Sequence, residues 1–494
     1  MAEVYSEEVE FETEFENHSD IIYRYIFPQN TATISTTSGG VFGPTTFIFP
    51  PAPTNLEKSS LNFQVQLPLV SLAYNYINGL GGCAVQRMRL VDQFSNAVWM
   101  DVSNFNQYCA LLQPSGTSLE EFLTKSFYST VPSSTAATSQ LYMMEDMSRF
   151  IQNPTVSFLT SYSATLVGSG TYVTSASIVL PTNLVGSYTA SNVDLFPQNS
   201  FTGRRQYYIG AVGTATYLDF QIPFSAFKFT VLDMDKLFYN PSNLQFEIYW
   251  NNTDNYCFSS TSATDPSAVG GSCVAITGTS QINNVNITLA NENNIHLVSE
   301  VVDKVTRGEG LKLQIPWITM TKSAFSSSTN HSYQIALSTA YGNSLLAIVT
   351  APFASLTSGT NAVNANTHQR GFISSYNSFI NNISISNPSF YNVAAGGSGG
   401  CQDYMIGNRK FLRGSVVQTL GEYISSEWQH WDSWFGTKPA HEVDCQNVDG
   451  LDLRKQNAVF QWQCVLSQSI ALNWVSALIG QKTLSLTSQG SLVY

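Results

Sequence analysis

The sequence predicts an all-β protein built from two tandem β-sandwich domains, with a few short helices and long loops. The first observation is a repeated segment, which reads LNFQVQ at residues 61–66 and LQFEIY at residues 244–249. Alternate residues of each segment are apolar, so each forms a strand with one face toward a core. One copy stands near the start of each half, which indicates two β-domains of related plan and favours an architectural role over catalysis.

The second observation is the length of the chain, and the third is a recurring strand end. A chain of 494 residues has room for two all-β domains of about 200–250 residues each. The motif Gln-Leu/Ile-Pro occurs at residues 66–68, 221–223 and 314–316. Proline cannot donate a ladder hydrogen bond, so it marks where pairing ends and a loop leaves. Short strands that end abruptly between long loops are typical of a sandwich.

The surface is predicted to carry unusually few charges. Charged residues make up 11% of the chain, against about 25% in ordinary soluble domains. The cores of protein interfaces are depleted in lysine, glutamate and aspartate, so the composition favours a protein whose surface is covered by neighbouring copies. An ordinary polar β-protein such as an adhesin is the alternative.

The charge balance is acidic. The net charge is −12, and the sequence contains no basic face or tail of the kind that grips nucleic acid. Glutamates are densest at the amino end, where Val9, Phe11 and Phe15 alternate with them. We interpret residues 1–20 as an acidic arm. The arm is either solvated, or it orders against a basic partner protein.

The pattern of cysteines and the lengths of the apolar runs indicate the cellular compartment in which the protein is made. The seven cysteines contain no C-x-x-C pair, which predicts free thiols in a reducing compartment; they are Cys83, Cys109, Cys257, Cys273, Cys401, Cys445 and Cys464. The amino end lacks the profile of a signal peptide. No apolar run approaches the ~18 residues of a membrane span. The sequence therefore predicts a soluble protein made inside the cell.

The elements of the first domain, residues 21–232, follow from local patterns. Residues 20–54 read as loop, and the first strand covers residues 61–67. A hairpin is expected over 84–102, a short helix over 104–112 and a second short helix from the capping box at 118–121. Residues 155–215 are rich in Ser, Thr and Gly and read as short strands with long loops. The last strand of this domain covers residues 216–224, where apolar residues alternate again.

The second domain is expected over residues 233–494. The period becomes helical at 297–307, and Gly308 supplies the stop; the shared face carries Val298, Val301, Val302 and Val305. Strands are predicted at 311–318, 333–338 and 345–350, with a last strand through Leu484 and Leu486. Residues 354–400 read as an exposed loop, with or without short strands. This loop and residues 155–205 are expected on the outer surface of the molecule.

Three segments match catalytic or metal-binding motifs only formally. Gly396–Gly400 fits G-x-S-x-G, but a nucleophile elbow needs a strand before it and a helix after it. Asn447–Asp452 resembles part of a calcium loop, whose ligand alternation Leu451 breaks, so whether an ion binds near Asp449 stays open. His441 and Cys445 lack a second pair at zinc spacing. We predict no catalytic, cofactor-binding or metal-ligating residues.

Two further clusters have ordinary structural interpretations. Asp233, Asp235 and Lys236 read as a turn that leads into a strand rather than as a catalytic set. Trp428, Trp431 and Trp434 fit a core or a subunit contact better than a sugar site. No phosphate-binding loop occurs in the sequence. The protein is therefore predicted not to be an enzyme.

Five segments, in order along the chain, resemble the double jelly-roll major capsid proteins of polinton-like viruses and virophages, relatives of the adenovirus hexon lineage. The first is NLEKSSLNFQVQLPLVSLAYNYINGLGGCAVQRMRLVDQFSNAVWMDVSNFNQYCALL at 55–112. The second is GAVGTATYLDFQIPFSAFKFTVLDMDKLFYNPSNLQFEIYWN at 210–251. The others are EVVDKVTRGEGLKLQIPWITM at 300–320, DYMIGNRKFLRGSVVQ at 403–418 and QKTLSL at 481–486.

The resemblance implies two tandem jelly rolls and a homotrimer in which six of them form a pseudo-hexagonal capsomer. Such capsomers tile the icosahedral shell of a double-stranded DNA virus. The implied partners are further copies of the chain, neighbouring capsomers and minor capsid or penton proteins, without sequence-specific nucleic-acid binding. The implied location is the virion capsid, synthesised and assembled inside the host cell. A lectin-like β-sandwich that serves in binding or adhesion is the alternative.

Overall fold

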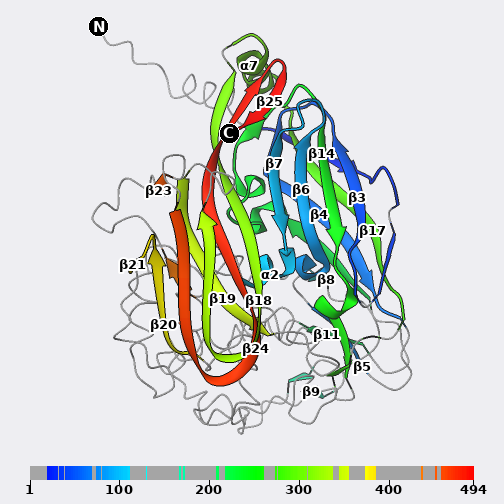
Figure 1. Cartoon of the computed structure of the whole chain (residues 1–494). Helices are drawn as coiled ribbons and strands as arrows, with labels where there is room; N and C mark the ends of the chain where they lie inside the picture. The colour runs from blue at the N-terminus through cyan, green and yellow to red at the C-terminus, as the bar shows by residue number, and fades with distance from the viewer. Residues whose placement is uncertain are drawn as a thin grey trace.

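The computed structural model describes part of the chain, and strands dominate that part, which confirms the predicted all-β class (Figure 1). The described residues are 19–31, 33–37, 39–68, 74–78, 81–111, 129–130, 166–167, 171–172, 207–210, 217–260, 273–274, 276, 278–308, 310–337, 344–354, 373–384, 435–437, 451–452 and 458–494.

The first β-sandwich consists of two facing sheets. The β4 sheet has seven strands, in the order β1-β17-β4-β12-β8, with β2 on β17 and β13 on β4. Their bounds are β1 Ile21–Ile26, β2 Ile34–Thr36, β4 Thr54–Gln66, β8 Ser129–Thr130, β12 Tyr217–Pro223, β13 Leu237–Phe238 and β17 Ser280–Glu292. The β14 sheet has the order β3-β14-β6-β7. Its bounds are β3 Phe42–Phe49, β6 Val85–Asp92, β7 Val98–Ser103 and β14 Leu244–Trp250.

The two copies of the repeated segment face each other in this one sandwich. The copy at 61–66 lies in β4 and the copy at 244–249 lies in β14, so the prediction of one copy in each domain is wrong. Their apolar faces meet across the core, where the rings of Phe63 and Trp250 lie 5.2 Å apart. The alternation itself was read correctly, because Leu61, Phe63 and Val65 are buried.

The strand pairing moves the domain boundary that was expected at residues 232 and 233. β14 pairs with β3 and β6, and β17 pairs with β1 and β4. Both strands lie after residue 233, and both complete sheets that begin before it. The sandwich therefore extends to Glu292, at the end of β17.

The later part of the chain forms the β24 sheet of eight strands, in the order β21-β20-β24-β19-β22, with β18 and β25 on β24 and β23 on β19. The bounds are β18 Leu311–Leu337, β19 Ser344–Ala354, β20 Ile373–Ile380, β21 Ile383–Ser384, β22 Phe435–Thr437, β23 Leu451–Asp452, β24 Ala458–Thr487 and β25 Gly490–Val493. Figure 1 shows the long β18 and β24 beside the first sandwich.

The strands predicted at 311–318 and 333–338 are one strand, β18, of 27 residues. It pairs with β24, which has 30 residues, along almost its whole length. The middle of β18 is polar and largely exposed, so it lacks the apolar alternation that reveals a strand.

Pro316 lies inside β18, opposite Gln481, rather than at a strand end. Among the described strands β18 pairs only with β24, so the missing N–H of this proline can point away from the ladder. The other two predicted strand ends hold, since Pro68 follows β4 and Pro223 closes β12.

Smaller elements complete the described part. The β5 sheet has the order β11-β5-β15-β16, and β9 pairs with β10. Their bounds are β5 Tyr74–Asn78, β9 Leu166–Val167, β10 Thr171–Tyr172, β11 Tyr207–Gly210, β15 Cys257–Ser260 and β16 Cys273–Val274. Four short 3-10 turns lie at Gly81–Ala84, Phe224–Ala226, Val231–Asp233 and Thr253–Asn255.

The described part contains two helices, and both were predicted. α2 spans Phe105–Leu111, and α7, which lies at the surface, spans Ile295–Thr306. Asn294 caps α7 through its side chain, which accepts from the His296 amide at 3.0 Å. Gly308 fits after the helix because a Cβ there would lie 2.7 Å from the Lys304 carbonyl oxygen. The capping box at 118–121 lies outside the described residues.

One stretch that read as loop contains strands, since residues 20–54 hold β1, β2 and β3. Residues 354–400, expected as a loop with or without short strands, hold β20 and β21. β1 escaped notice because its sequence, IIYRYI, is apolar at successive positions and does not alternate. Most of residues 155–205 and 354–400 lie outside the described part, so their expected place on the outer surface stays a prediction.

Candidate assembly surface

The segments with formal motif matches lie almost entirely outside the described residues. These are Gly396–Gly400, the pair His441 and Cys445, the three tryptophans at 428, 431 and 434, and residues 447–450 around Asp449. Leu451 and Asp452 form β23. Within the described part, no group of three or more His, Cys, Asp or Glu side chains is arranged to hold a metal ion.

Asp233 and Asp235 lie in a turn that leads into β13, as predicted. Lys228 donates to Asp233 Oδ1 at 3.0 Å, and Asn55 Nδ2 donates to Asp235 Oδ1 at 2.7 Å. Each carboxylate therefore has a structural partner: Asp233 ties the turn to the preceding segment, and Asp235 holds it against β4.

Two of the predicted free thiols can be placed. Cys109 and Cys257 are buried and form no disulfide. Burial raises the pKa of the Cys257 thiol well above its ordinary value, and its Sγ lies 3.2 Å from the Thr253 carbonyl oxygen. A thiol in such surroundings is unreactive.

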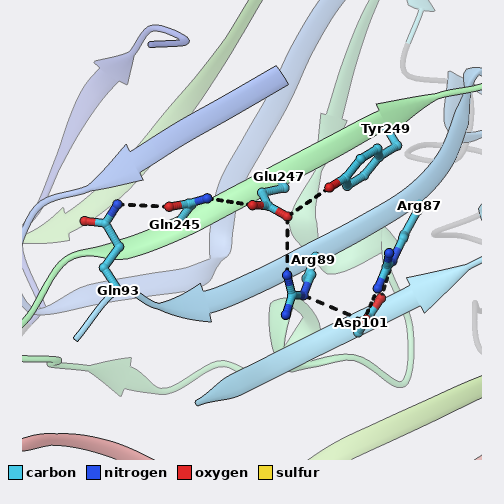
Figure 2. A network of polar contacts seen from close by, with 7 residues as sticks. All are labelled: Arg87, Arg89, Gln93, Asp101, Gln245, Glu247 and Tyr249. Atoms are coloured by element: carbon cyan, nitrogen blue, oxygen red, sulfur yellow. Dashed lines mark hydrogen bonds and ion pairs between the residues drawn. The ribbon is translucent and has the colours of Figure 1, made fainter. Parts of the chain in front are cut away.

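Charged side chains gather on the outer face of the β14 sheet, in a cluster that we call the outer charged patch (Figure 2). Strand pairing explains why they meet. Arg89 on β6 lies opposite Glu247 on β14 and opposite Asp101 on β7. Arg87 lies two residues before Arg89, so it points to the same face. The patch consists of Arg87, Arg89, Asp101 and Glu247, bordered by Gln93, Gln245 and Tyr249.

The strongest contact in the patch is bidentate. Arg87 donates from Nε to Asp101 Oδ1 at 2.7 Å and from Nη2 to Asp101 Oδ2 at 2.5 Å. The hydrogen bonds that Arg87 donates to Asp101 raise the pKa of Arg87 above its ordinary value, although burial opposes this. Arg89 bridges the two carboxylates at longer range, with Nε 3.8 Å from Asp101 Oδ2 and Nη1 3.7 Å from Glu247 Oε2.

Neutral side chains extend the patch along β14. Gln245 donates to Glu247 Oε1 at 2.6 Å, and Gln93 donates to Gln245 Oε1 at 3.0 Å. The Tyr249 hydroxyl donates to Glu247 Oε2 at 3.4 Å. Burial, followed by the charge of Glu247, raises the pKa of Tyr249, so this hydroxyl stays protonated.

The patch neutralises itself, because two guanidinium groups meet two carboxylates. Such partly exposed ion pairs stabilise a fold by only about 0–1 kcal/mol each. Every carboxylate already has a cation or donor, so no group is poised as a general acid or base. The patch can instead present a flat, neutral, hydrogen-bonding surface to another protein. Alternation along β6 gives Arg87 and Arg89 a common face, but only the strand register shows that Asp101 on β7 and Glu247 on β14 meet them.

A second polar cluster joins the first sandwich to the end of the chain, and we call it the C-terminal joint. The buried Asp92 carboxylate accepts from the Ser491 amide at 2.9 Å and from the Ser491 hydroxyl at 2.7 Å. It also accepts from the Phe94 amide at 2.8 Å and from the Ser242 hydroxyl. Trp99 Nε1 donates to Ser491 Oγ at 2.8 Å.

The hydrogen-bond donors around Asp92 keep its carboxylate ionised. Burial alone would raise its pKa, but the hydrogen bonds from Ser242, Ser491 and the Phe94 amide outweigh burial and lower the pKa below the ordinary value. The carboxylate is therefore held ionised at the contact between the β6–β7 turn and the β24–β25 hairpin. No sequence motif marks this joint, whose two ends lie 399 residues apart.

The edge strand β1 and the residue that follows it carry the densest group of exposed apolar side chains in the described part. These are Ile22, Tyr23 and Tyr25 on β1 and Phe27 just after it, of which Tyr25 is 68% exposed and Phe27 69%. β1 pairs with β17 on one side, and no described strand pairs with its other side. An apolar strand edge open to water invites pairing with another chain unless something covers it.

One end of β1 is fixed to the sheet by Glu292. Its carboxylate accepts from the Ser19 hydroxyl at 2.6 Å and from the amides of Asp20 at 2.8 Å and Asn294 at 3.0 Å. Burial opposes ionisation, but these donors prevail and lower the pKa of Glu292. The edge is therefore held in place from its first residue.

No family model and no curated protein matches the sequence. Three solved structures of similar fold cover almost the whole chain. PBCV-1 VP54, fitted into a reconstruction of the virophage Sputnik, has a TM-score of 0.48 at 8% identity and matches 97% of this chain and 97% of its own. A chain of the Sputnik virophage structure has a TM-score of 0.48 at 11% identity, covering 96% of this chain and 88% of that one.

The mavirus major capsid protein has a TM-score of 0.46 at 11% identity, covering 96% of this chain and 90% of that one. No helix of the described residues is long and apolar enough to cross a membrane. Along nearly its whole length, the chain is therefore similar to virus proteins that include a major capsid protein, the class that its sequence segments resemble.

Proposed function

We propose that this chain is a major capsid protein, a non-enzymatic subunit that assembles into the shell of a double-stranded DNA virus. The observation that carries the proposal is the open β1 edge, where apolar side chains stand exposed on a chain with only 11% charged residues. A protein that works alone keeps charges on such an edge, because they prevent pairing with other chains. A subunit covers the edge with a neighbour.

The outer charged patch supports the same function. Protein interfaces tolerate charges when those charges are paired and hydrogen-bonded, and they penalise unpaired ones. Arg87, Arg89, Asp101 and Glu247 are already paired within one chain. Another copy could cover this face without leaving a charge uncompensated.

The assembly that we propose is a homotrimer. A contact between two different surfaces of a chain, repeated around a threefold axis, closes into a ring. In the proposed assembly each chain contributes two sandwich units, so three chains form a capsomer of pseudo-hexagonal outline. Neighbouring capsomers and minor capsid or penton proteins would be the further partners in a virion assembled inside the host cell. The net charge of −12 fits a shell that leaves neutralisation of the genome to other proteins or ions.

Electron microscopy of the purified full-length protein tests this function. Capsid assembly predicts particles of hexagonal outline that form arrays or shells as the concentration rises. Isolated particles of single-chain size at every concentration would contradict it. A glycan array on the same sample addresses the binding-protein alternative, which predicts sugar-dependent binding by single-chain particles.

A further inference from the structure

We propose that the open edge of β1 takes up residues 8–16 from a second copy of the chain as an added antiparallel strand. The inference rests on the proposed self-assembly and names one contact within it. It concerns an edge that the structure defines and a segment outside the described residues whose sequence fits that edge.

The edge offers both hydrogen-bonding groups and an apolar face. Pairing of β1 with β17 uses one side of its backbone, so the N–H and C=O groups of the other side remain available. Tyr23 and Tyr25 share one face of the sheet, and the exposed Phe27 follows directly after β1. Arg24, the only charged residue of β1, lies on the opposite face.

Residues 8–16 have the sequence of a strand with one apolar and one acidic face. Val9, Phe11, Thr13 and Phe15 alternate with glutamates at 8, 10, 12, 14 and 16. A strand of this kind needs an apolar surface on one side and a cation or water on the other. Exposed aromatic residues and an arginine on opposite faces of β1 match this requirement.

One antiparallel register pairs Arg24 with a glutamate and keeps the aromatic residues together. If Glu14 lies opposite Arg24, then Phe15 lies opposite Tyr23 and Thr13 opposite Tyr25, while Phe11 reaches Phe27 just beyond the end of β1. The same register sets Glu16 opposite Ile22 and Glu12 opposite Ile26, so Arg24 is the residue that selects it. Aromatic pairs and pairs of opposite charge are the favourable cross-strand combinations. A shift by one residue would place glutamates opposite Tyr23 and Tyr25 and would leave Arg24 opposite an apolar residue or threonine.

A second copy fits this register better than the chain's own arm. Ser19, Asp20 and Ile21 are held along β17 by Glu292 and by strand pairing. If the arm of the same chain folded back onto β1, its turn would therefore have to lie at or before Ser19. A reversal over residues 17–19 keeps the correct faces but sets Glu16 opposite Asp20, two like charges. A strand from another copy avoids this repulsion and leaves Ser19 and Asp20 in place.

The test uses mixed full-length variants. Copies that carry Thr13→Cys are mixed under assembly conditions with copies of different mass that carry Tyr25→Cys, and the mixture is oxidised mildly. We expect a disulfide between the two introduced thiols that joins a light chain to a heavy one, identified by peptide mass mapping. Copies with Glu12→Cys in place of Thr13→Cys serve as the matched control, because that side chain points to the other face and Glu12 is not the partner of Arg24 in this register.

A charge exchange probes the register in the same assay. Arg24→Glu in the Tyr25→Cys copies should abolish the mixed disulfide, and Glu14→Arg in the Thr13→Cys copies should restore it. The inference is overturned if no mixed disulfide forms, or if the Glu12→Cys control cross-links equally well.

The mass of the unoxidised mixture separates the two proposals. Trimers without the mixed disulfide overturn the arm contact and leave the proposed function standing. Single chains at every concentration overturn both.

Discussion

At the scale of single residues, the hydrogen bonds of Asp92 span the longest stretch of sequence in the described part, 399 residues to Ser491. Asp92 holds Ser491 and Ser242 and remains ionised although buried. Replacing one partner of a buried, charge-assisted hydrogen bond leaves the other partners unsatisfied, which costs more than the bond itself contributes. The C-terminal joint should therefore be sensitive to changes that hardly alter volume.

Asp92→Asn should lower the free energy of unfolding by about 1–3 kcal/mol, because the amide accepts fewer hydrogen bonds than the carboxylate and adds donors without acceptors. Chemical denaturation of the variant measures this. Asp219→Asn is the control, since Asp219 is exposed and accepts from Gln64 at 2.7 Å. A loss for Asp92→Asn no larger than that of the control would contradict the role assigned to the joint.

The same carboxylate predicts a pH dependence. Its folded pKa lies below the ordinary value, which is about 3.9 for an unfolded aspartate. As the pH falls, the unfolded chain binds this proton first, so the contribution of Asp92 is complete above about pH 5 and declines below about pH 4. Denaturation midpoints measured from pH 7 to pH 3 should fall more steeply for the native chain than for Asp92→Asn. Parallel curves would contradict this.

Gly490 is predicted to tolerate no side chain. Its φ is +99°, and a Cβ there would lie 3.1 Å from Asp92 Oδ2. Gly490→Ala should therefore cost about 2–3 kcal/mol, from backbone strain and a displaced carboxylate. Gly39→Ala is the matched control, because Gly39 has a φ of +75° with no atom within 4 Å of the added Cβ. Equal losses in unfolding experiments would show that the joint does not confine Gly490.

At the scale of elements, buried and exposed aromatic residues should separate folding from assembly. Trp250→Ala removes a buried ring that contacts Phe63 and should cost about 3–5 kcal/mol of folding stability. Tyr25→Ser on the exposed β1 edge should change folding stability by less than about 0.5 kcal/mol. It should nevertheless weaken association, measured by sedimentation velocity across a concentration series. If Tyr25→Ser leaves association unchanged, β1 is not part of the interface.

Elements could be predicted from the sequence where burial on one face leaves a period. β4, β12, β14 and the β6–β7 hairpin alternate, and α7 carries its valines at helical spacing, so all of these were found. β1 is exposed on both faces and the centre of β18 is polar, so neither shows a period. Pro316 added a false strand end, because an edge strand tolerates proline.

At the scale of the whole molecule, one core connects the first sandwich to the β24 sheet. Trp99, Phe238, Ile315, Met320 and Val475 belong to a single buried cluster. The boundary expected at 232 and 233 rested on two copies of a repeated segment, and long-range pairing placed both copies in one sandwich. Such pairing leaves no local signal, which is also why the outer charged patch and the C-terminal joint could not be predicted from the sequence.

The exposed β1 edge, the self-neutralised patch and the scarcity of charge together indicate that this chain functions as part of a closed assembly of copies. Native mass spectrometry of the full-length protein at micromolar concentration measures the number of chains in that assembly. A closed threefold assembly predicts a species of three chains of 54.3 kDa each. A single 54.3 kDa species that persists at every concentration would contradict it.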